Sequence, residues 1–240
     1  MTQLRGEEKA QYVARMFARI ARRYDLLNAV MTGGAHQRWR RLAARLAVAG
    51  VPGPAQALDV GTGTGDLALA LARRPEVGQV AGVDVVPEML RLAQRKAARR
   101  GLQGRVRFLQ GDALALPFPE RSFDCVTTGF TMRNVADVGA ALREMARVTR
   151  PGGRLAVLEI FPVTRGPAAR LVQLYFRRVV PLLGRLLSGD AEAYRYLPAS
   201  VERFYDVAGF AHLLEESGWG QVSYRLLALG SVSIHLGSRR

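Results

Sequence analysis

The segment Ala57-Leu-Asp-Val-Gly-Thr-Gly-Thr-Gly-Asp66 is the most informative part of the sequence, and it places glycines at positions 61, 63 and 65. The apolar run 57–60 is typical of a buried strand, and the residues after Asp66 have a helical pattern. Glycine between a strand and a helix permits positive φ and lets a ligand approach the backbone closely. The helix N-terminus adds unpaired N–H groups that suit a carboxylate. The stretch therefore predicts a ligand-binding turn in an α/β protein.

Outward from this turn, short apolar runs alternate with helical patterns, as in βαβ units on a parallel sheet. We expect further strands at 79–85, 106–110, 123–128 and 154–160, the last entered through a turn at 150–153, and helices at 87–100 and 137–148. A helix near 206–217 and two closing strands at 221–227 and 231–237 follow, and helices at 7–31 and 36–49 precede the first strand. The predicted fold is α/β and Rossmann-like, with a mostly parallel seven-stranded sheet, a C-terminal antiparallel hairpin and an N-terminal helical cover.

A dinucleotide-binding turn is the first alternative for the glycine stretch. Its fingerprint, G-x-G-x-x-G, needs a glycine at position 66 or 68, where this chain has Asp66 and Ala68. The carboxylate of Asp66 would repel a pyrophosphate, whereas it would attract the amino group of a methionine moiety. The residues therefore favour S-adenosylmethionine over a dinucleotide.

Three further features fall where a methyltransferase needs them. Asp84 ends the second expected strand, about 20 residues beyond the glycines, where an acid accepts hydrogen bonds from ribose hydroxyls. Asp112, with Ala113 beside it, follows the third strand and suits the adenine ring, and Pro151-Gly-Gly is a recurrent methyltransferase turn. Asp84 or Asp112 alone is equally well interpreted as a helix cap or a solvated loop end. Together with the glycine turn, they predict an S-adenosylmethionine-dependent methyltransferase.

The chain also resembles the ubiquinone/menaquinone biosynthesis C-methyltransferases in segments spread over most of its length. The matching segments are 17–28, 34–40, 112–119, 123–127, Met132-Arg133-Asn134, 144–159, and 194–197 with Ser200. Two positions depart from that family, which often has glutamate where this chain has Leu114 and commonly serine where it has Gly129. A side-chain hydrogen bond to the cofactor from position 129 is therefore excluded.

The resemblance implies a class I methyltransferase fold and a definite reaction. Methyl transfer to a ring carbon of a polyprenylated quinol is implied, most simply demethylmenaquinol to menaquinol, although the residues do not separate naphthoquinol from benzoquinol. The cofactor contacts carried over are Thr64, Asp84, Asp112 and Ala113, with Gly129 as a backbone position, and Gly61, Gly63, Gly65 and Asp66 complete the predicted cofactor site. No metal site is predicted. We expect one domain, 1–240, in which 1–50 is the helical cover and 162–205 is a helical insertion on the substrate and lipid side.

Four residues in the family-like segments are candidates for the chemistry. Arg133 would hold the quinolate or a water, since its pKa makes it an unsuitable direct base, although pairing with an acid is an equally open interpretation. Asn134 would orient the same water. Tyr24 and His36 lie in the cover and would reach the ring from above, whereas core packing for Tyr24 and a packing or capping role for His36 explain them equally well.

The charge leaves the choice of partner open. Lys and Arg outnumber Asp and Glu by 35 to 20, giving +15, and such an excess attracts nucleic acid or an anionic membrane, or merely follows from an arginine-rich composition. An RNA methyltransferase is one rival, but no Asn/Asp-Pro-Pro-aromatic motif follows the fourth strand, Cys125 lacks the Pro-Cys context, and no nucleic-acid partner is expected. A small-molecule O- or N-methyltransferase and a non-catalytic cofactor-binding protein also stay open as rival functions.

Residues 167–188 mix apolar side chains with arginines. The larger apolar members include Leu171, Leu174, Tyr175, Phe176, Leu182, Leu183, Leu186 and Leu187. The segment would line a route for an isoprenoid tail, dock on an anionic membrane surface, or form a core or homodimer helix. With one cysteine, a polar N-terminus and no run of about 18 apolar residues, we expect a cytoplasmic protein that is peripheral on the inner face of the cell membrane if the segment docks there.

Overall fold

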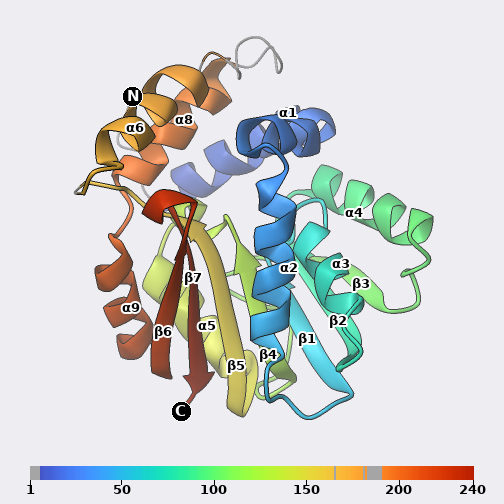
Figure 1. The fold of residues 1–240 in the computed structure, drawn as a ribbon. Helices are drawn as coiled ribbons and strands as arrows, with labels where there is room; N and C mark the ends of the chain where they lie inside the picture. Colours follow the sequence, from blue (N-terminus) through green and yellow to red (C-terminus); the bar gives the residue numbers. More distant parts are fainter. Residues whose placement is uncertain (1–5, 165, 181, 183–190) are drawn as a thin grey trace.

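The computed structural model describes residues 6–164, 166–180, 182 and 191–240 (Figure 1). Its centre is a seven-stranded sheet in the order β3-β2-β1-β4-β5-β7-β6. The strands are β1 (Ala55–Val60), β2 (Val77–Asp84), β3 (Val106–Gln110), β4 (Phe123–Gly129), β5 (Thr149–Ile160), β6 (Trp219–Leu227) and β7 (Val232–Arg239). β1 to β5 are parallel, and β7 runs antiparallel to both β5 and β6. The predicted fold class is confirmed.

Helices cover both faces of the sheet and its upper edge (Figure 1). They are α1 (Gly6–Thr32), α2 (Ala35–Ala47), α3 (Asp66–Ala72), α4 (Pro87–Arg99), α5 (Val138–Val148), α6 (Ala169–Leu174), α8 (Ala191–Glu202) and α9 (Val207–Glu216), with short turns η1 (Met132–Asn134), η2 (Tyr175–Val179) and η3 (Ala228–Gly230). Asp137 and Asp206 cap α5 and α9, each accepting a hydrogen bond from a backbone N–H three residues on.

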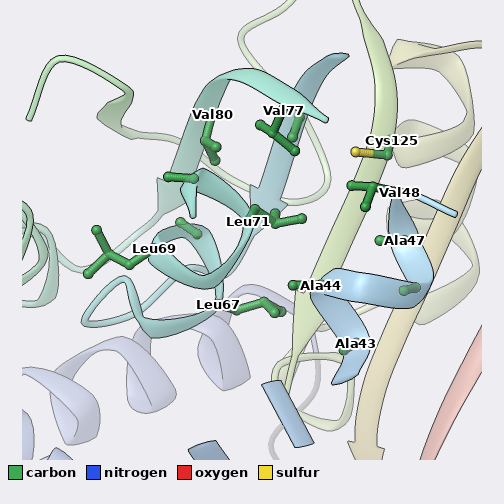
Figure 2. Packing of buried hydrophobic residues seen from close by; sticks show 14 of the residues in the cluster. Ala43, Ala44, Ala47, Val48, Leu67, Leu69, Leu71, Val77, Val80 and Cys125 are labelled. Carbon is green, nitrogen blue, oxygen red and sulfur yellow. The ribbon is translucent and has the colours of Figure 1, made fainter. Parts of the chain in front are cut away.

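The two faces of the sheet carry separate cores because successive strand residues point to opposite sides. Ala57 and Cys125 belong to the cluster formed with α2, α3 and α4, while their neighbours Leu58 and Val126 belong to the cluster formed with α5 and α9. Figure 2 shows Cys125 among the first set. Burial raises the pKa of its thiol to about 12, so Cys125 is a buried apolar side chain, as expected from its place in a strand.

The cover and the late helical segment pack on each other above the carboxyl ends of the strands. Met16 and Leu27 of α1 share a buried cluster with Val180, against which Tyr175 and Tyr196 also pack. Residues 191–202, which lie in the segment expected to be a helical insertion, form α8 with Pro198 inside it. This packing against α1 gives α8 its stability in spite of the proline.

One expected turn is part of a strand. β5 begins at Thr149 rather than near residue 154, so Pro151-Gly-Gly lies within the strand, at a register shift opposite Phe123 and Cys125. Gly152 has a φ of 75°. A Cβ at Gly153 would lie 2.9 Å from the carbonyl oxygen of Asp124. The two glycines therefore permit a bulge and a close backbone approach, rather than a turn ahead of the strand.

Within the described residues, no helix combines the length and apolarity needed to cross a membrane.

Candidate functional site

The glycine turn between β1 and α3 has the conformation that the sequence predicts. Gly61, Gly63 and Gly65 have φ values of 65°, 55° and 82°. A Cβ at Gly61 would lie 2.2 Å from Cγ2 of Thr131, and one at Gly65 would lie 2.9 Å from Cβ of Ala93, whereas one at Gly63 would meet nothing within 4 Å. Positions 61 and 65 therefore require glycine for packing as well as for φ, and position 63 leaves open space beside the turn.

A cavity of about 140 Å³ opens beside this turn. Eight of the nine residues predicted for the cofactor line it: Gly61, Gly63, Thr64, Asp66, Asp84, Asp112, Ala113 and Gly129. Gly65 is absent from the lining because it faces Ala93 and Phe108. The structure thus brings the predicted cofactor residues together, from four strand ends, at the sheet edge where α/β proteins bind ligands.

Asp84 holds the glycine turn while keeping acceptor capacity. Its Oδ2 accepts from the N–H of Gly63 at 2.8 Å and its Oδ1 from the N–H of Val86 at 2.9 Å. Burial raises the pKa of Asp84 against the effect of these hydrogen bonds. Each carboxylate oxygen has a further lone pair for a ribose hydroxyl. Asp112 is exposed and accepts from the N–H of Leu114 at 2.9 Å, so both its cofactor role and its loop-end role remain open.

Asp59 is a cavity residue that the sequence reasoning missed. It lies in the stretch 57–66, is fully buried, and accepts hydrogen bonds from the hydroxyls of Thr62 at 2.7 Å and Thr127 at 2.8 Å. Burial raises its pKa to about 6. An acidic residue inside an otherwise apolar strand is a signal that points to Asp59. Burying such a group costs free energy unless it is hydrogen-bonded or binds a ligand.

Asp66 is engaged by side chains as well as facing the cavity. Its Oδ1 lies 2.8 Å from Nζ of Lys96, and its Oδ2 accepts from Nε2 of Gln37 at 2.8 Å. Burial acts to raise the pKa of Asp66, but Lys96 and Arg40 hold it below its usual value. An amino group from a ligand would therefore join a carboxylate that is already paired, and this contact stays a prediction.

The same network ties the N-terminal cover to the glycine turn. The Thr64 hydroxyl donates to Asp25 of α1 at 2.6 Å and accepts from Lys96 of α4 at 2.8 Å. Lys96 also pairs with Asp25 at 2.6 Å. Apart from the presence of a lysine in an arginine-rich chain, no pattern in the sequence indicates this arrangement, because its members are distant in the chain.

A second cavity of about 500 Å³ lies under the cover and adjoins the first. Phe17, Tyr24, Phe130 and Asn134 line both cavities. The remaining wall is largely apolar and aromatic, with Leu171, Val172, Tyr175, Phe176, Val180, Tyr196 and Leu197 among its members. Three of the residues expected along a tail route therefore line it; Leu174 and Leu182 are exposed instead, and Leu183, Leu186 and Leu187 lie outside the described residues.

All four candidate catalytic residues line this second cavity. Arg133 forms an ion pair with Glu159, a residue with no exposed surface at the end of β5. Burial raises the pKa of Glu159 and the charge of Arg133 opposes it. The acid-pairing interpretation of Arg133 is thus confirmed, with Glu159 as a partner that the sequence did not identify. The ion pair leaves one donor of the Arg133 guanidinium free, because its buried Nε has no hydrogen-bond partner among the described residues.

Asn134 stands where the two cavities meet. Its Nδ2 donates to the carbonyl oxygen of Phe130 at 3.2 Å. Its Oδ1 is buried and accepts no hydrogen bond from the described part of the chain. Buried polar atoms are usually satisfied, so a free acceptor at this junction is suited to a hydroxyl or a water.

The hydrogen bonds of His36 set its tautomer. The Thr32 hydroxyl donates to the carbonyl oxygen of Asn28 at 2.6 Å, so it accepts from Nδ1 of His36 at 2.8 Å. The amide of Gln37 is a donor to Asp66, and it approaches Nε2 of His36 at 3.2 Å as a donor too. Burial, followed by the charge of Arg40, lowers the pKa of His36 to about 4. His36 is a neutral imidazole whose acceptor nitrogen is occupied, which favours positioning over proton abstraction.

Tyr24 packs against a neighbouring aromatic ring and also lies where the two cavities meet. Its ring meets that of Phe17 edge to face, with centroids 5.8 Å apart. It also lines both cavities, so the packing and the ring-contact interpretations hold together.

Known proteins match the chain along almost its whole length. The model of the ubiE/COQ5 methyltransferase family matches residues 5–239. A demethylmenaquinone methyltransferase of Thermus thermophilus is 50% identical over 93% of this chain and 100% of its own. One of Deinococcus radiodurans is 45% identical over 98% of this chain and 95% of its own. The crystal structure of a SAM dependent methyltransferase from Aquifex aeolicus superimposes with a TM-score of 0.55 at 23% identity, covering 78% of this chain and 83% of that one, and shows the fold alone.

Proposed function

The chain belongs to the ubiE/COQ5 methyltransferase family, and we propose that it transfers a methyl group from S-adenosylmethionine to a ring carbon of demethylmenaquinol. S-adenosylmethionine is the family's cofactor and methyl transfer its reaction; the acceptor is the proposed part. The observation that carries it is the pair of adjoining cavities, one edged with carboxylates and the other apolar and large enough for a bicyclic ring. The names of the relatives at 45–50% identity favour the naphthoquinol ring over the benzoquinol ring.

The cofactor residues fit that ligand chemically. In the proposal, Asp84 accepts from the ribose hydroxyls, and Asp112 with Ala113 holds the adenine. The backbone of Gly61, Gly63 and Gly129 allows close approach, while Thr64 and Asp66 face the methionine end. Gly65 does not line the cavity, and it instead allows the turn to pack closely against Ala93 and Phe108.

The acceptor would be held where the cavities meet. S-adenosylmethionine, when bound, supplies a methyl group carried on a positively charged sulfur. The free Nε of Arg133 would donate to the quinol oxygen as negative charge develops on it, and Oδ1 of Asn134 would accept from the hydroxyl or a water that carries its proton away. Glu159 orients Arg133, Tyr24 contacts the ring, and His36 positions the wall beside it.

The apolar wall would assist the same step. A cationic donor and a quinolate acceptor lose their charges as the new carbon–carbon bond forms and the carbon–sulfur bond breaks. The hydrogen on the methylated ring carbon then moves as a proton to the ring oxygen, which restores the aromatic quinol. Exclusion of water by the aromatic lining favours this loss of charge, and holding the two reactants in contact removes much of the entropic cost. We propose that residues 1–50 and 162–205 serve this purpose as the cover and insertion of a single domain, 1–240.

We also propose peripheral contact with an anionic membrane through the segment 167–188. Leu171 and Leu174 are exposed, and the exposed Arg170 and Arg178 lie near them in the chain. Flotation with anionic vesicles at low salt tests it, and a chain that stays unbound overturns it. If light scattering instead shows a dimer that is lost when Leu171 and Leu174 are replaced by aspartate, this face binds a second copy.

The acceptor is tested directly by supplying the chain with cofactor labelled in the methyl group. Demethylmenaquinol, its oxidised form demethylmenaquinone, a benzoquinol analogue and total RNA are offered separately. Label is expected in the naphthoquinol, and only when the ring is reduced, because the oxidised ring lacks the hydroxyls that make its carbon nucleophilic. Label in RNA alone, or equal label in the oxidised ring, would overturn the proposal.

A further inference from the structure

Two leucines belong both to the surface and to the wall of the large cavity. Leu171 of α6 is 61% exposed and Leu229 of η3 is 65% exposed, yet both line the cavity of about 500 Å³. In Figure 1 the turn that joins β6 and β7 lies beneath α6. A side chain that faces solvent and cavity at once marks an opening, so these two segments form its rim.

The turn that carries Leu229 has an unfavourable backbone. Ala228 and Leu229 have φ values of 47° and 57°, a region that side chains with a Cβ rarely adopt. The turn is nevertheless held in place: the Ser231 hydroxyl donates to the carbonyl oxygen of Ala228 at 2.7 Å, and the N–H of Phe161 donates to the carbonyl oxygen of Ser231 at 2.9 Å. The fold therefore maintains a strained turn that displays an apolar side chain at a cavity mouth, and strain of this kind concentrates at functional positions.

The cavity has room for only part of a polyprenylated quinol. Cavities of roughly 300–1,000 Å³ enclose drug-sized ligands, so about 500 Å³ holds the ring and the start of the tail. A longer tail has to leave through an opening, and outside it needs apolar surroundings. We propose that the isoprenoid tail leaves the cavity between Leu171 and Leu229 and passes directly into an anionic lipid bilayer on which this mouth rests. The inference rests on the proposed quinol substrate.

Charge complementarity favours an anionic bilayer as the occupant of this face. Arg170 and Arg178 are exposed on the helical segment that carries Leu171, and Leu174, one turn further on, is 55% exposed. Arg177 lies between Arg170 and Arg178 in the chain, but it forms an ion pair with the exposed Glu202 at 3.3 Å. Leucines that reach into the acyl region with arginines at headgroup level form a standard interfacial arrangement, and the chain's net charge of +15 adds long-range attraction.

The test uses two variants and a matched control. Leu229→Asn removes the apolar side chain with a residue that tolerates the left-handed region, so the turn still forms, and Leu171→Asp places a charge at the opposite rim. Leu226→Asn is the control, because Leu226 is 52% exposed on β6 but is not part of the cavity wall. Each chain is floated with vesicles of phosphatidylglycerol and of phosphatidylcholine. Each is also assayed with a quinol of one prenyl unit in solution and with a long-tailed quinol in vesicles.

The expected result is selective. A chain that carries both Leu171→Asp and Leu229→Asn should lose most of its binding to phosphatidylglycerol vesicles, and its kcat/KM for the long-tailed quinol should fall about tenfold more than that for the one-prenyl quinol. Leu226→Asn should behave as the parent. If both vesicle binding and the ratio of the two kcat/KM values stay unchanged, the tail does not leave the cavity between Leu171 and Leu229, and the proposal is wrong. Failure of the parent chain to methylate the one-prenyl quinol would instead overturn the quinol substrate, and the vesicle arm would still decide the docking.

Discussion

The cofactor cavity and the acceptor cavity are built in opposite ways. Around the glycine turn, the carboxylates of Asp59, Asp66 and Asp84 are held by hydrogen bonds from neighbouring loops and helices. Around the acceptor cavity, Arg133 and Asn134 each keep a buried polar atom without a partner among the described residues. The first cavity is formed mainly at the carboxyl ends of β1 to β4, with α1 along one side, whereas the second is bounded by α1, α6 and α8. If the proposed function is correct, the ligand shared by many methyltransferases binds at the sheet edge, and the variable acceptor binds beneath the segments that lie over it.

The largest expected effect comes from the acceptor side. Arg133→Ala should lower kcat by about 10²–10³, with little change in cofactor affinity, because in the proposed reaction the guanidinium stabilises negative charge on the quinol oxygen. Turnover and cofactor titration on the same preparation measure it, with a melting curve to detect destabilisation from the unpaired Glu159. Arg147→Ala is the control, since Arg147 pairs with Glu144 at 2.7 Å away from both cavities. If Arg133→Ala mainly weakens cofactor binding, Arg133 contacts the cofactor and not the quinol.

The second expected effect is that the free energy of unfolding depends on pH through His36, which lines the acceptor cavity. The pKa of His36 is about 4 in the folded chain against about 6.5 unfolded, so the unfolded state takes up the proton first. The stability this group contributes is present above pH 6.5 and is lost as the pH falls toward 4, by up to about 3 kcal/mol.

Chemical denaturation at several pH values checks this. His36→Gln should reduce the loss of stability between pH 6.5 and 4 only in part, since the buried His235 also has its pKa lowered to about 4 and contributes to the same loss. An unaltered slope in the His36 variant would show that His36 is not held neutral by its surroundings.

The smallest expected effect lies on the cofactor side. Asp84→Asn should weaken cofactor binding by about tenfold, or about 1.4 kcal/mol, because the amide loses the charge and one acceptor while keeping its shape. Equilibrium titration with the cofactor measures it, and the KM for the quinol should stay near the parent value. Glu88→Gln is a matched control, an exposed acid at the start of α4. If the quinol KM shifts as much as the cofactor affinity, the two cavities are not separable in this way.

Much of the cofactor side could be predicted from the chain because its signals are local. Gly61 and Gly63 follow a strand directly, and Asp84 and Asp112 come at the ends of the next two. Parallel strands place their carboxyl ends along one edge of the sheet, so residues far apart in sequence meet there once the strand order is known. Asp59 was missed because a buried acid has no periodic pattern of its own.

The acceptor side depended on resemblance for its candidates and on tertiary packing for their partners. The α/β sheet, the turn from Gly61 to Asp66 and the acids at the following strand ends can be derived from the chain, since they follow from residue type and spacing along neighbouring elements. The folded structure was needed to find that Glu159 pairs with Arg133, that Lys96 and Gln37 bond Asp66, and that Leu229 lies at the cavity mouth. These residues lie on different elements, with Arg133 in η1 and Glu159 in β5, and with Lys96, Gln37 and Asp66 in α4, α2 and α3. No local pattern in the chain encodes which of these side chains will meet.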